Sequence, residues 1–249
     1  MSLYDINKEI DPKAVVKRGN AEISKEALEI ALKKSLTFWE DLSSNDKTRI
    51  IDNTYPVKYK KGESIHRGDS DCIGILLIQT GGLRTYILSE DGREVTLYRL
   101  TPVDVCVLSS SCVLSNITFD VHIDADFDSE LLIINSEVYS DLAANNLYIE
   151  NFTNKEAVAR FSDVMWAMQQ ILFMSFDKRL ASFLLDEISR DSSLEIHMTH
   201  DQIAKYVGSA REVVSRMLKY FASEGIVTLQ RGGITILDKA RLRKIVGLI

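Results

Sequence analysis

A stretch near the carboxyl end places charged and hydroxyl side chains at close spacing. In SAREVVSR, residues 209–216, four such side chains fall on one side of an expected helix: Arg211, Glu212, Ser215 and Arg216. Arginine can pair with guanine O6 and N7, glutamate accepts from the cytosine N4 amino group, and serine bonds to either kind of base edge. The four side chains therefore predict base readout in a DNA major groove.

The other side of the same helix is apolar. Val214, Met217, Leu218 and Phe221 lie at i, i+3, i+4 and i+7, which predicts a buried stripe and a presented charged face. The charged face lies in the first two turns, where helices that enter the groove contact bases. The alternative is a solvated face with a Glu212–Arg216 ion pair, worth only about 0.3–0.5 kcal/mol.

The surrounding sequence has the signals of a helix-turn-helix. Thr199-His-Asp-Gln202 is a capping box that opens a short helix ended by Gly208. We expect Ser209-Ala-Arg-Glu212 to be a second capping box, opening a helix ended by Gly225. IVTLQRGGITILD then predicts a small hairpin wing. Because all these signals agree, they favour DNA readout over a solvated face.

Phosphate contacts need cations or hydrogen-bond donors around the groove. Candidates of both kinds occur in and around the two helices and the wing, namely Thr199, His200, Lys205, Lys219 and Arg231. His200 could equally be an ordinary surface histidine.

The charge distribution is uneven. The net charge of −6 alone argues against a nucleic-acid partner. Residues 190–249, however, hold 10 Lys and Arg against 6 Asp and Glu, a net +4, whereas residues 1–189 hold 20 against 30, a net −10. A basic module on an acidic body is typical of a binding head joined to a regulatory body.

The middle of the chain is rich in β-forming residues. Residues 55–137 have short Val-, Ile-, Thr- and Tyr-rich runs between regular turn signals, which predicts an antiparallel barrel or sandwich. TYILSEDGREVTLYRL is the clearest hairpin, around Glu90-Asp91-Gly92. The preceding residues, from Ser24 to about Asn53, have helical spacing, and residues 1–23 have no pattern.

A long helix is expected after the barrel, from Leu147 to about residue 175. Its apolar positions step by 3, 4, 3 and 4 residues through Val158, Phe161, Met165, Met168 and Leu172. This heptad-like seam predicts a dimerisation helix. The alternative is a helix buried against its own barrel. A second helix is expected over Asp177–Arg190.

We therefore predict an α+β chain of four parts. These are an N-terminal extension (1–23), a sensor domain with a helix and an antiparallel β-roll or jelly-roll barrel (24–146), a dimerisation helix (147–175) and a winged helix-turn-helix (176–249).

Residues 36–245 resemble the Crp–Fnr family of bacterial transcription regulators. VGSAREVVSRMLKYFASEGIV is similar to the family's winged helix-turn-helix, and the barrel segment from KYKKGESIHRGD to VTLYRL is similar to its cyclic-nucleotide-binding-type β-roll. The family's Arg-Glu-x-x-(Gly/Ser)-Arg pattern falls on Arg211, Glu212, Ser215 and Arg216. The resemblance implies a homodimer on a palindromic operator with TGTGA- or TTGAT-like half-sites, a signal received in the barrel, and RNA polymerase as a partner.

The sensor segment departs from the relatives that bind cyclic AMP. Val103 replaces their usual glycine, Val107-Leu108 stands near their Gly-Glu position, and no arginine occurs between Arg99 and Arg160. Since a buried phosphate needs a cationic partner, this argues against cyclic AMP. The chain has only three cysteines, which argues against a four-cysteine iron–sulfur cluster. The effector and any cofactor stay unknown.

An uncharged pocket is the remaining expectation for the effector. Its predicted lining combines a barrel segment with the long helix: Val105, Cys106, Val107, Leu108, Cys112, Phe161, Met165 and Trp166. On one straight strand Cys106 and Cys112 would be about 20 Å apart, so a thiol switch needs the loop to fold back, and buried apolar cysteines are favoured. For the two barrel histidines we expect an exposed His66 and a packed His122 rather than haem ligands.

Two other function classes compete with a DNA-binding regulator. One is a barrel enzyme, which would use a His-x-His and carboxylate metal set, yet His66 and His122 lie far apart in sequence. The other is a ligand-binding signalling protein without DNA readout, which would not need the charged face of residues 211–216. We predict no enzyme activity and no metal. No signal peptide or run of about 18 apolar residues is visible, so we expect a cytoplasmic protein without a membrane partner.

Overall fold

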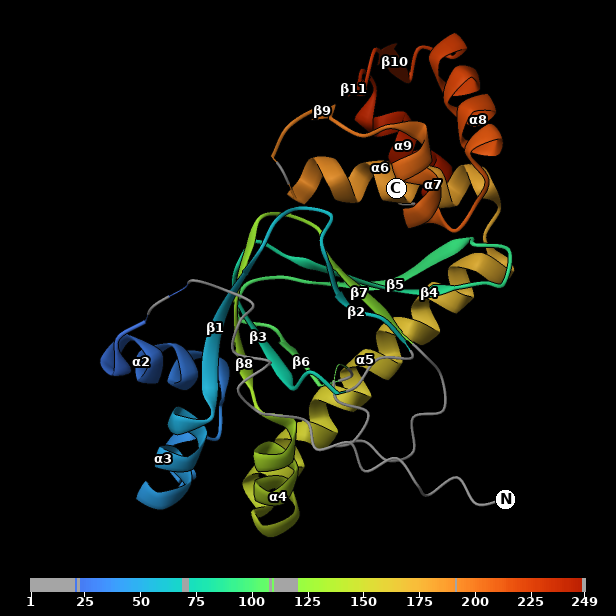
Figure 1. Cartoon of the computed structure of the whole chain (residues 1–249). Helices are drawn as coiled ribbons and strands as arrows, with labels where there is room; N and C mark the ends of the chain where they lie inside the picture. Colours follow the sequence, from blue (N-terminus) through green and yellow to red (C-terminus); the bar gives the residue numbers. More distant parts are fainter. Residues whose placement is uncertain are drawn as a thin grey trace. The chain divides into compact units, whose positions relative to one another are not determined.

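The chain forms two compact units. The computed structural model describes residues 21, 23–68, 72–107, 109, 121–190 and 192–247 (Figure 1). The barrel unit holds the described residues up to Leu83 together with Leu100–Ala157, and the helical unit holds Arg84–Arg99 together with the chain from Val158 onward. The division thus passes through a β-hairpin and through a long helix.

The described strands of the barrel form two four-stranded sheets. One has the order β1-β8-β3-β6 and the other the order β2-β7-β4-β5. Strand β1 pairs antiparallel with β8, with Thr54 opposite Ile134 and Tyr59 opposite Ser129. The strands are β1 (Thr54–Tyr59), β2 (Ser64–His66), β3 (Ile75–Thr80), β4 (Leu83–Leu88), β5 (Glu94–Leu100), β6 (Val105–Cys106), β7 (His122–Ala125) and β8 (Ser129–Ile134).

The barrel core is built from continuous apolar runs. The run Ile75–Ile78 is fully buried, and Leu131–Ile134 is nearly so. A strand that is apolar at successive positions must be covered on both faces. His66, at the end of β2, is also buried, at 7% exposed, so the expectation of an exposed His66 is wrong. Ile65 and His66 are adjacent and both buried, which the irregular register of β2 against β7 between Ser64 and His66 allows.

Helices flank the barrel strands in sequence. They are α2 (Lys25–Ser35), the 3-10 turn η1 (Trp39–Asp41), α3 (Ser44–Asp52) and α4 (Ser136–Asn145). The helical stretch expected from Ser24 to about Asn53 is therefore two helices and a turn. The reason is local, because Ser24 and Ser43 each accept a backbone hydrogen bond at a helix start, from the amides of Ala27 and Asp46.

The longest helix belongs to both units. Helix α5 (Leu147–Phe173) has 27 residues, so it is about 40 Å long. Its first two turns are anchored by buried Ile149 and Phe152, and the unit boundary falls between Ala157 and Val158. Among the described residues, no helix is long and apolar enough to cross a membrane.

The helical unit continues with a compact winged fold. Its elements are α6 (Phe176–Arg190), β9 (Glu195–Ile196), α7 (His200–Val207), α8 (Arg211–Ser223), β10 (Val227–Gln230), β11 (Gly233–Ile236) and α9 (Lys239–Val246). The sheet order is β10-β11-β9, so the predicted wing hairpin is confirmed and β9 adds a third strand. The core joins α6, α7, α8 and the wing through Leu184, Ile203, Leu218 and Ile234, all at most 2% exposed. Sequence analysis did not predict β9 or α9.

Candidate nucleic-acid interface

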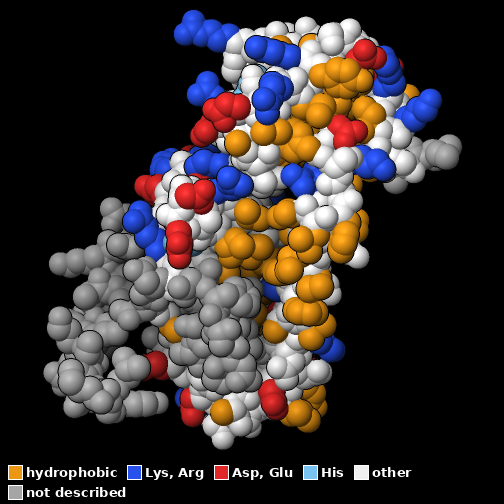
Figure 2. All heavy atoms as spheres, turned by 90° about the vertical axis from the view of Figure 1, so that its right-hand side faces the viewer, with side chains coloured by type: hydrophobic (Ala, Val, Ile, Leu, Met, Phe, Trp, Pro, Cys, Tyr) orange, Lys and Arg blue, Asp and Glu red, His pale blue; other side chains and the backbone are white. Residues whose placement is uncertain are grey.

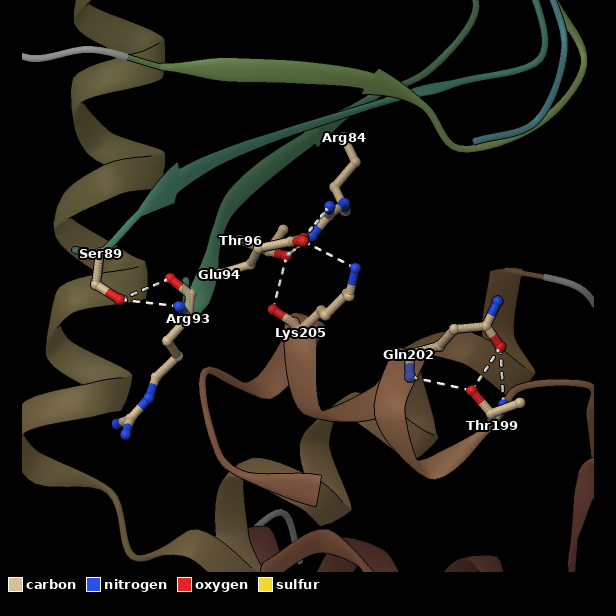
Figure 3. A network of polar contacts seen from close by, with 8 residues as sticks. All are labelled: Arg84, Ser89, Arg93, Glu94, Thr96, Thr199, Gln202 and Lys205. Atoms are coloured by element: carbon tan, nitrogen blue, oxygen red, sulfur yellow. Dashed lines mark hydrogen bonds and ion pairs between the residues drawn. The ribbon is translucent and has the colours of Figure 1, made fainter. Parts of the chain in front are cut away.

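Helix α7 begins and ends as its sequence predicts. The Gln202 amide donates to Thr199 Oγ1 at 3.2 Å, and the Thr199 amide donates to Gln202 Oε1 at 2.8 Å, so the capping box is confirmed (Figure 3). Gly208 ends the helix at φ 60°, in the left-handed region. This conformation favours glycine because it has no Cβ, and it turns the chain directly into α8.

Helix α8 begins one residue later than a second capping box requires. Its N-cap is Ala210, whose side chain cannot accept a hydrogen bond, so the predicted Ser209–Glu212 capping box is wrong. The Ser209 amide instead donates to the Ala204 carbonyl within the turn, at 3.0 Å. The first helical residues are therefore Arg211 and Glu212.

The two faces of α8 differ as predicted. Val214, Leu218 and Phe221 are fully buried, and Met217 packs partly buried against the same core. On the other face Arg211, Glu212 and Arg216 are exposed, and Ser215 is half-buried. The buried stripe fixes the rotation of the helix and thereby presents the charged face to solvent.

The exposed charged side chains of α8 have no ion-pair partner in the described part of the chain. In the described part of the molecule, Glu212 and Arg216 form no ion pair with each other, and Arg211 has no carboxylate partner. The alternative of a face stabilised by a Glu212–Arg216 pair is therefore not what the structure shows. The charges stay available to an outside partner.

An open groove lies beside the start of α8. It has a volume of about 660 Å³ and is lined by Met198, Thr199, His200, Asp201, Arg211, Gln230, Gly232 and Gly233. Two of the proposed phosphate contacts, Thr199 and His200, thus meet one proposed base contact, Arg211. The wing residues Gln230, Gly232 and Gly233 were missed from sequence, although the Gly232-Gly233 turn marked the wing tip.

The groove carries charges of both signs, because Asp201 lines it together with Arg211. Burial lowers the pKa of His200 below its ordinary value, and the neighbouring charges of Arg211 and Lys219 lower it further. Both cations must therefore lie close to the imidazole. A phosphate at this groove would lie near the positive charge of Arg211 and the negative charge of Asp201. It would also lie near His200, which would gain its proton more easily once the phosphate is present.

The other predicted phosphate contacts lie in different surroundings. Lys219 on α8 and Arg231 at the wing turn are exposed. Lys205 on α7 is only partly exposed, and its Nζ donates to Glu94 Oε1 at 2.8 Å. Of the five candidates, Lys205 is thus held by an acidic partner within the chain.

The predicted dimer seam is exposed in the single chain. Val158, Phe161 and Leu172 are each 65% exposed, and Met165 and Met168 are 44% and 46% exposed. Figure 2 shows apolar side chains gathered on one face of the molecule. An exposed apolar face of this kind is typical of a surface that another surface covers.

The predicted effector pocket combines residues from both units. In the barrel unit Val105, Cys106 and Val107 are buried, whereas Leu108 and Cys112 lie outside the described residues. In the helical unit Phe161, Met165 and Trp166 are exposed, and Trp166 lines a cavity of about 340 Å³ together with Tyr98 and Arg179. The buried state expected for Cys106 is confirmed, and the pocket as a whole stays a prediction.

Comparison with known proteins agrees with this geometry. A profile described as the Crp-like helix-turn-helix domain matches residues 178–245. A crystal structure from Eubacterium rectale, assigned to the crp/fnr family of transcriptional regulators, is 48% identical in sequence. The similarity covers 84% of this chain and 97% of that one, with a TM-score of 0.83. This chain belongs to the Crp/Fnr family.

Other similar proteins share less of their sequence with this chain. The transcriptional activator protein anr of Pseudomonas aeruginosa is 24% identical over 88% of this chain and 89% of its own length. FixK2 from Bradyrhizobium japonicum shares the fold at 21% identity, with a TM-score of 0.62 over 77% of this chain and 96% of that chain. The chain is accordingly a DNA-binding transcription regulator of the Crp/Fnr type, with a barrel domain and a helix-turn-helix.

Proposed function

We propose that this Crp/Fnr regulator reads a palindromic operator as a homodimer, with Arg211, Glu212, Ser215 and Arg216 contacting bases. The observation that carries the proposal is the face of α8. Its charged side chains are exposed and form no ion pair among the described residues, whereas Val214, Leu218 and Phe221 on the opposite side are fully buried. Arginine suits guanine and glutamate suits cytosine. The half-sites would lie one helical turn apart, about 34–36 Å.

Phosphate contacts would surround this face. Thr199, His200 and Arg211 line one groove, and exposed Lys219 and Arg231 flank it. Contacts of this kind fix the register of the protein on DNA without reading its sequence. Lys205 could join them only after leaving Glu94.

The dimer would form along α5. Val158, Phe161, Met165, Met168 and Leu172 keep heptad-like spacing and are exposed in the single chain, which supports a second copy as their cover. Dimerisation would supply the two-fold symmetry that a palindrome needs. The barrel would receive a small-molecule or redox signal, and the regulator would act in the cytoplasm, with RNA polymerase as a partner and without enzyme activity of its own.

Selection of bound sequences from random double-stranded DNA tests the proposal. Purified full-length protein should enrich a palindrome with guanine-bearing half-sites one turn apart at a fixed, stated salt concentration. The variant Arg243→Ala, which removes an exposed arginine of α9, should enrich the same palindrome. Enrichment of single, unpaired half-sites would contradict the dimeric arrangement, and loss of enrichment even when cell extract supplies the effector would contradict sequence readout.

A further inference from the structure

The β4–β5 hairpin belongs to the helical unit. Its residues Arg84–Arg99, which we call the hairpin arm, group with α6 and α7 rather than with the rest of the barrel strands. The arm contacts α7 through charged and polar side chains that come from more than 100 positions away in sequence. Such contacts are specific because each needs a partner of matching charge or hydrogen-bonding type.

Glu94 is the centre of the first contact. Its carboxylate binds Arg84 of the arm on one side, and it accepts from Lys205 Nζ of α7 at 2.8 Å on the other (Figure 3). The Thr96 hydroxyl adds a bond to the Lys205 carbonyl, at 3.1 Å. The arm therefore holds Lys205 by both its side chain and its backbone.

The Glu94 carboxylate is charged in this setting. Burial alone would raise the pKa of Glu94, but the hydrogen bonds from Lys205 and Arg84 outweigh burial and lower it. The side chains of Arg84 and Glu94 are 7% and 15% exposed, and the Arg84 guanidinium lies 4.0 Å from the ring centre of Tyr86. Arg84 is thus fixed within the arm, whereas Lys205, at 42% exposed, has access to solvent.

A second contact holds the arm beside the first. The Arg99 guanidinium lies 3.8 Å from the ring centre of Tyr206, the residue after Lys205. Arg99 also pairs with Glu187 of α6 at 2.5 Å, and Glu187 is only 3% exposed. This contact does not involve the Glu94 carboxylate, so opening of the Glu94–Lys205 pair would leave a link between the arm and α6 and α7.

We propose that the hairpin arm is an inhibitory element in which Glu94 withholds Lys205 from DNA phosphates. The inference deepens the proposed function and rests on it. The ammonium group cannot serve both anions well, because a phosphate placed within bonding distance of Lys205 would lie close to the Glu94 carboxylate and repel it. Separation of Glu94 from Lys205 would free the ammonium group for a DNA phosphate, and a signal that separates the two would change DNA affinity through this one charge.

The variant Glu94→Gln tests the proposal on the full-length protein. It keeps the size of the side chain and removes the charge that holds Lys205. We expect binding of a fluorescent duplex of arbitrary sequence to tighten about fivefold near 0.1 M salt, with the slope of log affinity against log salt steeper by about 1. Glu90→Gln, an equal charge change on the exposed tip of the arm, should alter affinity less than about twofold and leave the slope unchanged.

Two more variants test whether Glu94→Gln acts through Lys205 or only through the net charge of the protein. In a Lys205→Gln background, Glu94→Gln should no longer tighten binding, because the cation that it releases is absent. Thr96→Val removes the bond to the Lys205 backbone without a charge change, so it should tighten binding by a smaller factor, about twofold. Thermal unfolding followed by circular dichroism shows whether each variant is folded. If Glu94→Gln does not fold, Thr96→Val still tests the role of the arm.

The outcomes of these binding measurements distinguish failure of the inhibitory arm from failure of the proposed function. If Glu94→Gln matches Glu90→Gln, weakens binding, or still tightens it without Lys205, the inhibitory arm is wrong while the proposed function stands on wild-type binding. If wild type and every variant fail to bind any duplex, the proposed function fails together with the arm. If wild type fails and Glu94→Gln binds, both are supported.

Discussion

Two charged clusters of the helical unit differ in their exposure and in their ion pairing. On α8 the guanidinium and carboxylate groups of Arg211, Glu212 and Arg216 are exposed and form no ion pairs with one another. Around the hairpin arm, Arg84, Glu94 and Glu187 are nearly buried and bind partners of opposite charge. The first arrangement keeps charges ready for an outside ligand, and the second uses them to fix one arrangement of the chain.

The two clusters also differ in the free energy that an unpaired charge costs. An exposed charge costs little to leave unpaired, whereas a buried charge that loses its partner carries a desolvation penalty of several kcal/mol. Mutations in the first cluster should therefore change DNA binding without changing stability, and mutations in the second should change stability as well. The predictions below follow from this contrast.

The largest effect is expected at Glu187. Glu187→Gln leaves Arg99 and Arg190, which both bind this carboxylate at 2.5 Å, with a weaker partner in a buried setting. The helical unit should lose about 3 kcal/mol of unfolding free energy. Urea denaturation followed by circular dichroism measures the loss. Glu224→Gln, at an exposed ion pair with Arg241, should cost less than about 1 kcal/mol. Equal losses of unfolding free energy at the two sites would contradict the difference proposed between buried and exposed charges.

The next effect concerns the α8 face. Arg211→Ala or Arg216→Ala should weaken binding to the selected operator by about 1–3 kcal/mol and leave the unfolding midpoint unchanged. Fluorescence anisotropy on the operator and on a scrambled duplex, at one salt concentration, gives the comparison. An equal loss on both duplexes would mean that these arginines contact phosphates and do not read bases.

A smaller effect is expected at the turn between α7 and α8. Gly208→Ala places a Cβ where φ is +60°, although its nearest neighbours, Ile171 and Val95 side-chain atoms, lie at ordinary contact distances of 3.5–3.7 Å. The cost should thus come from the backbone alone, about 1 kcal/mol of unfolding free energy. Gly233→Ala, where φ is not in the left-handed region, serves as the matched control, and a similar cost there would point to packing instead.

The smallest effect is a pH dependence from His200. Its pKa is lowered in the free protein by burial and by Arg211 and Lys219, and a bound phosphate would raise it again. Binding would then take up a proton, so affinity should rise as pH falls through the interval between the free and bound pKa values, and level off above it. Titration of DNA affinity from about pH 8 to pH 5.5 should show a severalfold change that His200→Gln removes. A wild-type profile no steeper than that of the variant would place the phosphate elsewhere.

Local patterns of sequence were reliable guides to this structure. The spacing of Val214, Leu218 and Phe221 predicted the buried stripe of α8, since helical periodicity depends only on neighbours in the chain. The Thr199–Gln202 capping box and the Gly208 turn were predicted for the same reason. The Ser209 capping box failed because Ser209 belongs to the turn, where its backbone amide donates to the Ala204 carbonyl, and the helix begins after Ala210.

Contacts between distant segments could not be predicted in this way. Glu94 and Lys205 are 111 residues apart, and no periodicity links a hairpin to a helix at that separation. The Arg99–Glu187 pair spans 88 residues and was missed for the same reason. Lys205 therefore stood in the sequence as one more cation near a groove, and only the fold shows which carboxylate holds it.

Helix α5 has a mechanical consequence for any regulator built on it. Its hydrogen-bonded backbone runs without interruption across the boundary between the two units, after Ala157. A helix rotates by about 100° and advances by about 1.5 Å for each residue, so its length sets an angular phase between whatever is attached at its ends. Insertion of one residue after Ala157 would turn everything downstream by more than a quarter of a circle, while seven residues would nearly restore the phase. The number of residues in this helix therefore determines the angle, about the helix axis, between the elements attached at its two ends.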